Sequence, residues 1–283
     1  MSQNNERPVA VVTGASSGIG KAAARALLAR GWRVIGVGRD PDRCAQAARE
    51  LGDSPDGAFT MLRADLSRLP EAAQVAAQIG ARAPELDVLV NNAGGVQAER
   101  AITPEGHEAT FAANHLGPFL LTQRLLPNLK AAVASRVITV SSSGHEHCPA
   151  MRWDDLTYAD GYVAGAAYCH AKLANVLFAR ELARRTAADG VVSHAMHPGV
   201  VDSNFADHCD PPMKAYMLSI KDRALTPEQA ADTLVWLATD EQPGRSTGLY
   251  WHDRQALPPS PAAQDDEAAK RLWELSEAAV SGY

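Results

Sequence analysis

The chain has 283 residues, 46% of them hydrophobic, which is enough for one α/β domain with a sizeable core. Its formal net charge of -6 and its lack of a Lys/Arg run argue against nucleic acid as a partner. No apolar signal region precedes Pro8, and no stretch approaches the ~20 apolar residues that span a bilayer. We therefore expect a cytoplasmic protein, without a membrane partner, that acts on a small molecule.

The cysteines form no recognisable motif, because no two of them stand in a C-x-x-C arrangement, and this usage fits a reducing compartment. The "HEHC" stretch offers His145, His147 and Cys148 as metal ligands, but no second ligand pair follows at a suitable spacing. We expect no metal site. The cysteines are Cys44, Cys148, Cys169 and Cys209.

Short apolar runs alternate with longer helical patterns along most of the chain. Strands are predicted at residues 9–13, 33–37, 59–64, 88–91, 137–141 and 191–197, with a seventh, edge strand at 248–251. Helices are predicted at 20–30, 42–51, 68–81, 110–133, 166–188, 227–238 and 265–279. This alternation, with few hairpin signals, predicts a single-domain Rossmann-like fold: a doubly wound parallel sheet of about seven strands with helices on both faces.

Two segments depart from the alternation. Residues 201–226 show no clean period, and we interpret them as a lid or wall of a substrate pocket, with a plain surface excursion as the alternative. Residues 257–283 form a C-terminal extension, in which a Pro-rich loop leads to the last predicted helix.

A glycine turn follows the first predicted strand in "VAVVTGASSGIGKAAARALL". Gly14, Gly18 and Gly20 permit a tight turn, the close approach of a pyrophosphate, and close packing of helix on strand. The helix would then point its free N–H groups at the phosphates. We predict a dinucleotide site here that also includes Ser16, Ser17 and Ile19.

The end of the second predicted strand indicates which dinucleotide is bound. Gly38 stands where an acidic residue would hold the ribose 2′-hydroxyl of NAD(H), and Arg39 follows it. A guanidinium suits a 2′-phosphate, so NADP(H) is favoured over NAD(H). In the alternative reading, Arg39 is a solvated surface residue and Asp40 caps the next helix.

Seven short motifs occur in order along nearly the whole chain. They are "TGASSGIG", "ADL" at 64–66, "NNAG" at 91–94, "NHLGPFLLT" at 114–122, "VSSSGH" at 140–145, "YCHAK" at 168–172 and "HPGVVDS" at 197–203. Together they resemble the short-chain dehydrogenase/reductase family. Within it, "NHLGPFLL" and "YCHAKLANVLFARELARR" are most similar to the retinol-dehydrogenase-like branch.

The resemblance implies four catalytic residues. Tyr168 would be the general acid that protonates a carbonyl oxygen, or the base in the reverse direction, and Lys172 would bind the nicotinamide ribose and lower the pKa of the tyrosine. Ser142 would hydrogen-bond the substrate oxygen, and Asn114 would hold a proton-relay water. A free phenol titrates near ~10, so a nearby ammonium is a physical means of favouring the tyrosinate.

The motif from Tyr168 to Lys172 also has a plainer interpretation, because a packed tyrosine and a snorkelling lysine fit any amphipathic helix. Ser142 precedes Tyr168 by 26 residues, so the intervening segment must loop out and return. Ser141 and Ser143 are adjacent alternatives, although strand alternation points them away from the face that Ser142 uses.

The resemblance also implies further cofactor contacts. The residues that would meet the adenine, the adenosine ribose and the nicotinamide end are Asp65, Leu66, Asn91, Ala93, Gly94, Pro198, Gly199, Val201 and Ser203, in addition to Tyr168 and Lys172. Structural roles are open alternatives, since an Asp after a strand often caps a helix and buried Asn side chains often satisfy backbone groups.

These patterns predict an NADP(H)-dependent reductase of ketones or aldehydes, or a dehydrogenase of the corresponding alcohols, whose substrate is lipophilic or aromatic. An inactive dinucleotide-binding sensor or scaffold and an NAD-linked alcohol dehydrogenase are the alternatives. A homodimer or homotetramer would use the helices at 110–133 and 166–188. The candidate pocket residues are Trp153, Tyr162, Met213, Tyr216 and Met217.

Overall fold

The computed structural model describes residues 7–52, 57–201 and 209–283. Eight strands form one sheet in the order β3-β2-β1-β4-β5-β6-β7-β8, in which every pair is parallel except β7 and β8. The strands are β1 (Val9–Thr13), β2 (Arg33–Gly38), β3 (Phe59–Arg63), β4 (Val88–Asn91), β5 (Arg136–Val140), β6 (Val192–Met196), β7 (Tyr250–His252) and β8 (Gln255–Leu257). The chain is thus a Rossmann-like α/β domain, as predicted, with one strand more than expected.

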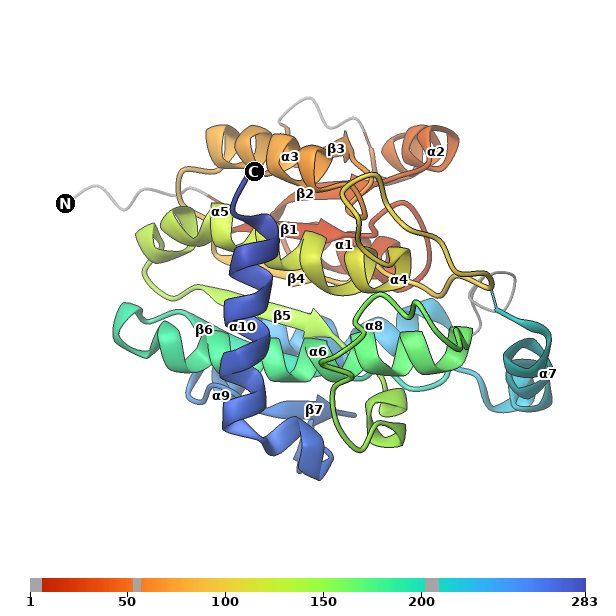
Figure 1. Ribbon diagram of the computed structural model, residues 1–283. Helices are drawn as coiled ribbons and strands as arrows, with labels where there is room; N and C mark the ends of the chain where they lie inside the picture. The colour runs from red at the N-terminus through yellow and green to blue at the C-terminus, as the bar shows by residue number, and fades with distance from the viewer. Residues whose placement is uncertain (1–6, 53–56, 202–208) are drawn as a thin grey trace.

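Helices cover both faces of the sheet (Figure 1). One core lies beneath α3 (Leu69–Arg82), α5 (Gly117–Ala131), α6 (Ala164–Arg185) and α10 (Asp266–Val280). The other lies beneath α1 (Gly18–Leu28) and α8 (Pro227–Thr239). The side chains of β1 alternate between these cores, with Val9 and Val11 in the first and Ala10 and Val12 in the second, as a strand buried on both faces requires. The shorter helices include α2 (Pro41–Leu51), η3 (Ala187–Asp189) and α9 (Glu241–Gly244).

The helix predicted at 110–133 is divided into three parts. A short α4 (Ala109–Phe111) begins at Glu108, whose carboxylate accepts hydrogen bonds from the N–H groups of Thr110 and Phe111. The π-helical segment η1 (Ala112–Leu116) follows, and α5 begins with a proline in its first turn. Single π turns inside helices are frequent at functional sites, and this one contains Asn114.

The segment predicted to be irregular contains a helix. Within 201–226, the structure forms α7 (Pro211–Ser219) and the short η5 (Lys221–Arg223). The prediction was wrong here because it relied on hydrophobic period: α7 begins through its cap instead, with the Asp210 carboxylate accepting from Met213 N at 3.0 Å and prolines in the first turn. Ser203 lies outside the described residues.

The C-terminal extension runs through η6 (Pro261–Gln264) into α10, which lies across α6 (Figure 1). Trp273 of α10 stacks on Phe178 of α6, with ring centroids 5.9 Å apart, and meets Phe119 of α5 edge-on at 5.0 Å. The extension therefore covers part of the helix face that the sequence predicts as an oligomer interface. Within the described ranges, no helix is both long enough and apolar enough to cross a bilayer.

Candidate active site

The glycine turn joins β1 to α1 at the carboxyl edge of the sheet. Gly14 and Gly18 have φ of +71° and +53°, which favour glycine, and a Cβ on Gly20 would lie 2.4 Å from the Gly14 carbonyl oxygen. Ser17 is the N-cap of α1, and within the described chain its side chain makes no capping hydrogen bond. The first N–H groups of α1 are thus available to an anion, and the glycines leave space for it.

Thr13 and Asn92 hold this turn, and the sequence analysis did not identify them. The Asn92 amide donates to Thr13 O at 2.8 Å, and the Thr13 hydroxyl accepts from Asn92 N and Ala93 N, each at 2.9 Å. These bonds tie the end of β1 to the end of β4. The available signal was the position of both polar residues at the carboxyl ends of buried strands, with Thr13 as the last residue of β1 and Asn92 directly after β4.

The end of β2 carries Gly38 and Arg39. A Cβ on Gly38 would lie 2.7 Å from both Cys44 Sγ and Met61 Cε, so a larger residue at this position would require those side chains to shift. The Arg39 side chain is 61% exposed, and its guanidinium lies 3.9 Å from the carboxylate of Asp65 at the end of β3. Asp40 caps α2 by accepting a hydrogen bond from Arg43 N at 2.9 Å. The exposed Arg39 side chain and the helix cap at Asp40 are therefore both present after β2.

Asp65 and Leu66 differ in exposure at the end of β3. The Asp65 carboxylate accepts hydrogen bonds from the backbone N–H and the hydroxyl of Ser67, and these bonds form a local turn. The Leu66 side chain is buried in the core beneath α3 and α5, which leaves only its backbone to meet a ligand.

The two predicted asparagines have structural partners. The Asn91 amide donates to Thr122 Oγ1 at 2.9 Å. The Asn114 amide donates to Gly95 O and Thr110 O, each at 2.7 Å, and its Oδ1 accepts from Gly95 N at 3.2 Å. These bonds occupy both N–H groups of the Asn114 amide and hold the backbone at Gly95, after β4. Gly94 packs tightly here, because a Cβ on it would lie 2.3 Å from Asn114 Oδ1 and 3.5 Å from Lys172 Nζ.

Ser142, Tyr168 and Lys172 come together at the carboxyl end of β5. Ser142 begins the short helix η2 (Ser143–His147), where its Oγ accepts from Gly144 N at 3.1 Å, and its side chain is hydrogen-bonded to Tyr168. Lys172 lies one turn along α6, with Nζ 5.4 Å from the Tyr168 ring centroid and 3.1 Å from Val140 O. The segment between η2 and α6 loops out and returns, as the 26-residue separation required.

The neighbouring serines lie elsewhere. The Ser141 hydroxyl is buried and donates to Lys172 O at 2.7 Å, and Ser143 is exposed on η2. Ser142 is therefore the serine whose side chain meets Tyr168.

Burial controls the protonation of both catalytic candidates on α6. It raises the pKa of Tyr168, and the hydrogen bond with Ser142 offsets this only in part. Burial also lowers the pKa of Lys172 to about 8. The sequence analysis expected Lys172 to lower the pKa of Tyr168, whereas the main influences on that pKa here are desolvation, which raises it, and the hydrogen bond with Ser142, which lowers it. The phenol is consequently protonated at neutral pH.

The residues after β6 approach the same edge of the sheet. Gly199 has a φ of +86°, and its N–H donates to His197 Nδ1 at 3.1 Å. Val201 forms an isolated parallel bridge with Leu225, which joins the described end of this loop to the segment before α8. Pro198 stands between His197 and Gly199, so the three described residues of this motif follow β6 at the carboxyl end of the sheet, and their contacts with a cofactor stay a prediction.

The predicted pocket residues separate into two groups. Tyr162 and Met213 pack with Tyr168, Val96 and Cys209 in a small apolar cluster, and Tyr162 donates to Gln97 O at 2.6 Å. We call this set, with Ala164, the Tyr168 cluster.

Trp153 belongs to a different apolar cluster. Trp153 packs against the main core, and the guanidinium of Arg271 on α10 lies 4.6 Å from its ring centroid. Its role in a substrate pocket stays a prediction. Met217 is half-buried on α7, and the side chain of Tyr216 lies outside what the structure describes.

The sequence matches the family model of short chain dehydrogenases over residues 8–213. The chain belongs to this family. It is 36% identical to human retinol dehydrogenase 13, over 93% of this chain and 81% of that protein. It is 38% identical to retinol dehydrogenase 12 of Bos taurus, over 95% and 84% of the two chains. These relatives place this short-chain dehydrogenase in the retinol-dehydrogenase-like branch that its motifs resemble.

Solved structures agree with this assignment. An uncharacterized protein from Mycobacterium Paratuberculosis superimposes with a TM-score of 0.79 and 31% identity, covering 97% of this chain and 93% of the other. The Pseudomonas aeruginosa RhlG/NADP active-site complex matches with a TM-score of 0.68 and 30% identity, covering 86% and 93%. The short-chain dehydrogenase is thus an oxidoreductase of a family that binds a nicotinamide dinucleotide and acts on small molecules.

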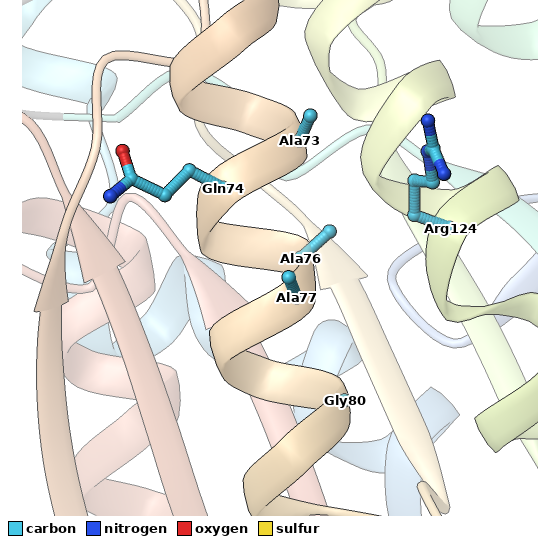
Figure 2. Close-up of a pocket in the computed structure, with 6 residues that line it drawn as sticks. All are labelled: Ala73, Gln74, Ala76, Ala77, Gly80 and Arg124. Atoms are coloured by element: carbon cyan, nitrogen blue, oxygen red, sulfur yellow. The ribbon is translucent and has the colours of Figure 1, made fainter. Parts of the chain in front are cut away.

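A separate hollow of about 460 Å³ lies on the surface between α3 and α5 (Figure 2). Small residues of α3 form most of its floor, and Arg124 of α5 stands at its side. None of the predicted site residues that the structure describes lines this hollow.

Proposed function

We propose that this short-chain dehydrogenase is an NADP(H)-dependent reductase of ketones or aldehydes on lipophilic or aromatic small molecules. The observation that carries the proposal is the hydrogen bond between Tyr168 and Ser142 beside the apolar Tyr168 cluster. A proton donor and a second hydroxyl there adjoin Val96, Met213 and Cys209, which suit an apolar substrate better than a charged one.

The preference for NADP(H) is supported by the end of β2. Arg39 offers an exposed guanidinium to a 2′-phosphate, and Gly38 stands where an acidic residue would hold a 2′-hydroxyl. The glycine turn with the open N-terminus of α1 suits the pyrophosphate. The similarity to an NADP complex agrees with this choice.

Ser142, Tyr168 and Lys172 have separate roles in the proposed reaction. The dinucleotide supplies the hydride when it is bound. Ser142 donates a hydrogen bond to the carbonyl oxygen as negative charge develops there, and Tyr168 delivers a proton to that oxygen. A phenol with a raised pKa is protonated before the reaction, which is the form that a reduction requires. The ammonium of Lys172, one turn along α6, stabilises the tyrosinate that remains.

The experiment follows NADPH and NADH absorbance with aromatic, aliphatic and small polar carbonyl compounds. We expect NADPH to be oxidised with the lipophilic compounds, and Tyr168→Phe to reduce kcat by roughly 100-fold or more, because the proton donor is lost. Tyr158→Phe is the matched control, since that buried hydroxyl bonds to His170 rather than to Ser142.

Two results would contradict the proposal. Turnover restricted to small polar carbonyl compounds would overturn the substrate class. NADPH binding without turnover on any compound, unchanged by Tyr168→Phe, would favour the sensor interpretation. Cytoplasmic location stays a prediction from the sequence.

A further inference from the structure

His145 is fully buried in η2, and both nitrogens of its ring are hydrogen-bonded. Nδ1 lies 2.7 Å from the carbonyl oxygen of Ser142, and Nε2 lies 3.1 Å from the backbone nitrogen of Ser260 in the C-terminal extension. A backbone N–H can only donate, so Nε2 must be the acceptor. A neutral ring then carries its proton on Nδ1, which donates to Ser142 O.

This arrangement connects the C-terminal extension with the catalytic candidates. Ser260 N–H donates to His145, and His145 donates to the backbone of Ser142 from both its ring and its own N–H, the latter at 3.1 Å. The Ser142 hydroxyl accepts from Gly144 N and bonds to Tyr168. The carbonyl group and the side chain of Ser142 are therefore both held by η2.

We propose that His145 is a positioning residue, a neutral Nδ1–H imidazole that fixes the backbone of Ser142 so that its hydroxyl faces Tyr168, with Ser260 selecting the tautomer. This inference rests on the proposed function in one respect, that Ser142 and Tyr168 meet the substrate. His145 itself touches no reacting atom.

The surroundings of His145 keep the ring neutral. Burial lowers its pKa, and the Tyr250 ring of β7 packs edge-on against it at 4.9 Å between centroids. The charged or titratable neighbours are Glu146 and His147 on the same short helix and His197 after β6. A protonated ring would point a second N–H at the Ser260 N–H, where it would find no acceptor.

The tautomer can be measured without any substrate. Nitrogen-15 NMR of histidine-labelled protein at pH 7, with His145→Asn to assign the signals, should show a protonated Nδ1 and an unprotonated Nε2 for His145. A ring protonated at Nε2, or at both nitrogens, would overturn the inference. This readout stands even if no carbonyl compound is turned over, so failure of the proposed function is distinguished from failure of the inference.

Two amide variants then separate the two hydrogen bonds of His145. The amide nitrogen of His145→Asn takes the approximate place of Nδ1 and can donate to Ser142 O. The longer amide of His145→Gln reaches the place of Nε2 and can accept from Ser260 N. If His145 positions Ser142, Asn keeps kcat within ~10-fold of the wild type, whereas Gln loses ~100-fold, as a misplaced catalytic group does.

Both variants should bind NADPH with unchanged affinity, measured by fluorescence titration, which also shows that they are folded. The reverse order, with Gln active and Asn inactive, would mean that His145 serves only to hold Ser260, and the inference would fail. Equal activity of both variants and the wild type would contradict it as well.

Discussion

At the residue scale, Lys172 illustrates that a group proposed to assist catalysis can oppose folding. Its side chain is 4% exposed, and burial lowers its pKa to about 8 from 10.5. Below pH 8, folding therefore buries a charge that the unfolded chain leaves in water, at a free-energy penalty of about 3 kcal/mol. This penalty decreases as the pH rises from 8 to 10.5, because the folded protein releases the proton first.

We predict that Lys172→Met raises the free energy of unfolding by up to about 3 kcal/mol at pH 7. In this variant Val140 O loses its hydrogen bond from Lys172 but keeps the one from the Asn175 amide at 3.1 Å. Urea denaturation at pH 7 and pH 10 measures the gain, which should shrink at the higher pH. Lys270→Met, at an exposed position on α10, is the control and should show no such dependence. A variant less stable than the wild type at pH 7 would refute this account.

At the element scale, the end of β2 carries the proposed preference for NADP(H). We predict that Arg39→Ala weakens NADPH binding by about 10-fold or more and leaves NADH binding unchanged, because one charge-assisted hydrogen bond to the 2′-phosphate is lost. Fluorescence titration with both dinucleotides measures this. Arg124→Ala removes the same charge from the outer face of α5 and should change neither affinity (Figure 2). Equal losses for both dinucleotides would refute the assignment of Arg39.

The elements that the sequence predicted well are those with a strong apolar pattern. All seven predicted strands exist, and the glycine turn, Ser142, Tyr168 and Lys172 meet at one sheet edge, because strand ends and helix spacing follow from local residues. The missed features depend on capping or on distant contacts. β8 follows a tight turn at Asp253 and Arg254, both with positive φ, where no glycine signals a hairpin.

The contacts of Trp153 and His145 with the C-terminal extension were missed for the same reason. The partners that determine their positions, Arg271 and Ser260, belong to the C-terminal extension more than a hundred residues away in the chain. No local period or motif indicates such a distant contact. The sequence therefore singled out Trp153 and His145 as candidate functional residues but could not predict which residues they contact.

At the scale of the whole molecule, α10 completes the core on the α6 side. Trp273 contacts Phe119 and Phe178, and the guanidinium of Arg185 lies 4.5 Å from its ring centroid. We predict that Trp273→Ala lowers the free energy of unfolding by about 3–5 kcal/mol in urea denaturation, because a large buried ring is lost. Leu275→Ala, on the same helix with 40% exposure, should cost less than about 1 kcal/mol. Equal effects would show that α10 is not part of the cooperative core.

The position of β1 also has a consequence for synthesis on the ribosome. β1 lies inside the sheet, where Ala10 pairs with Val34 of β2 and with Val88 of β4. Because β4 is translated long after β1, one edge of this buried, apolar strand stays unpaired while the intervening helices emerge. Nascent chains that stall before β4 therefore display a hydrophobic strand edge, the kind of surface that chaperones shield and that otherwise promotes aggregation.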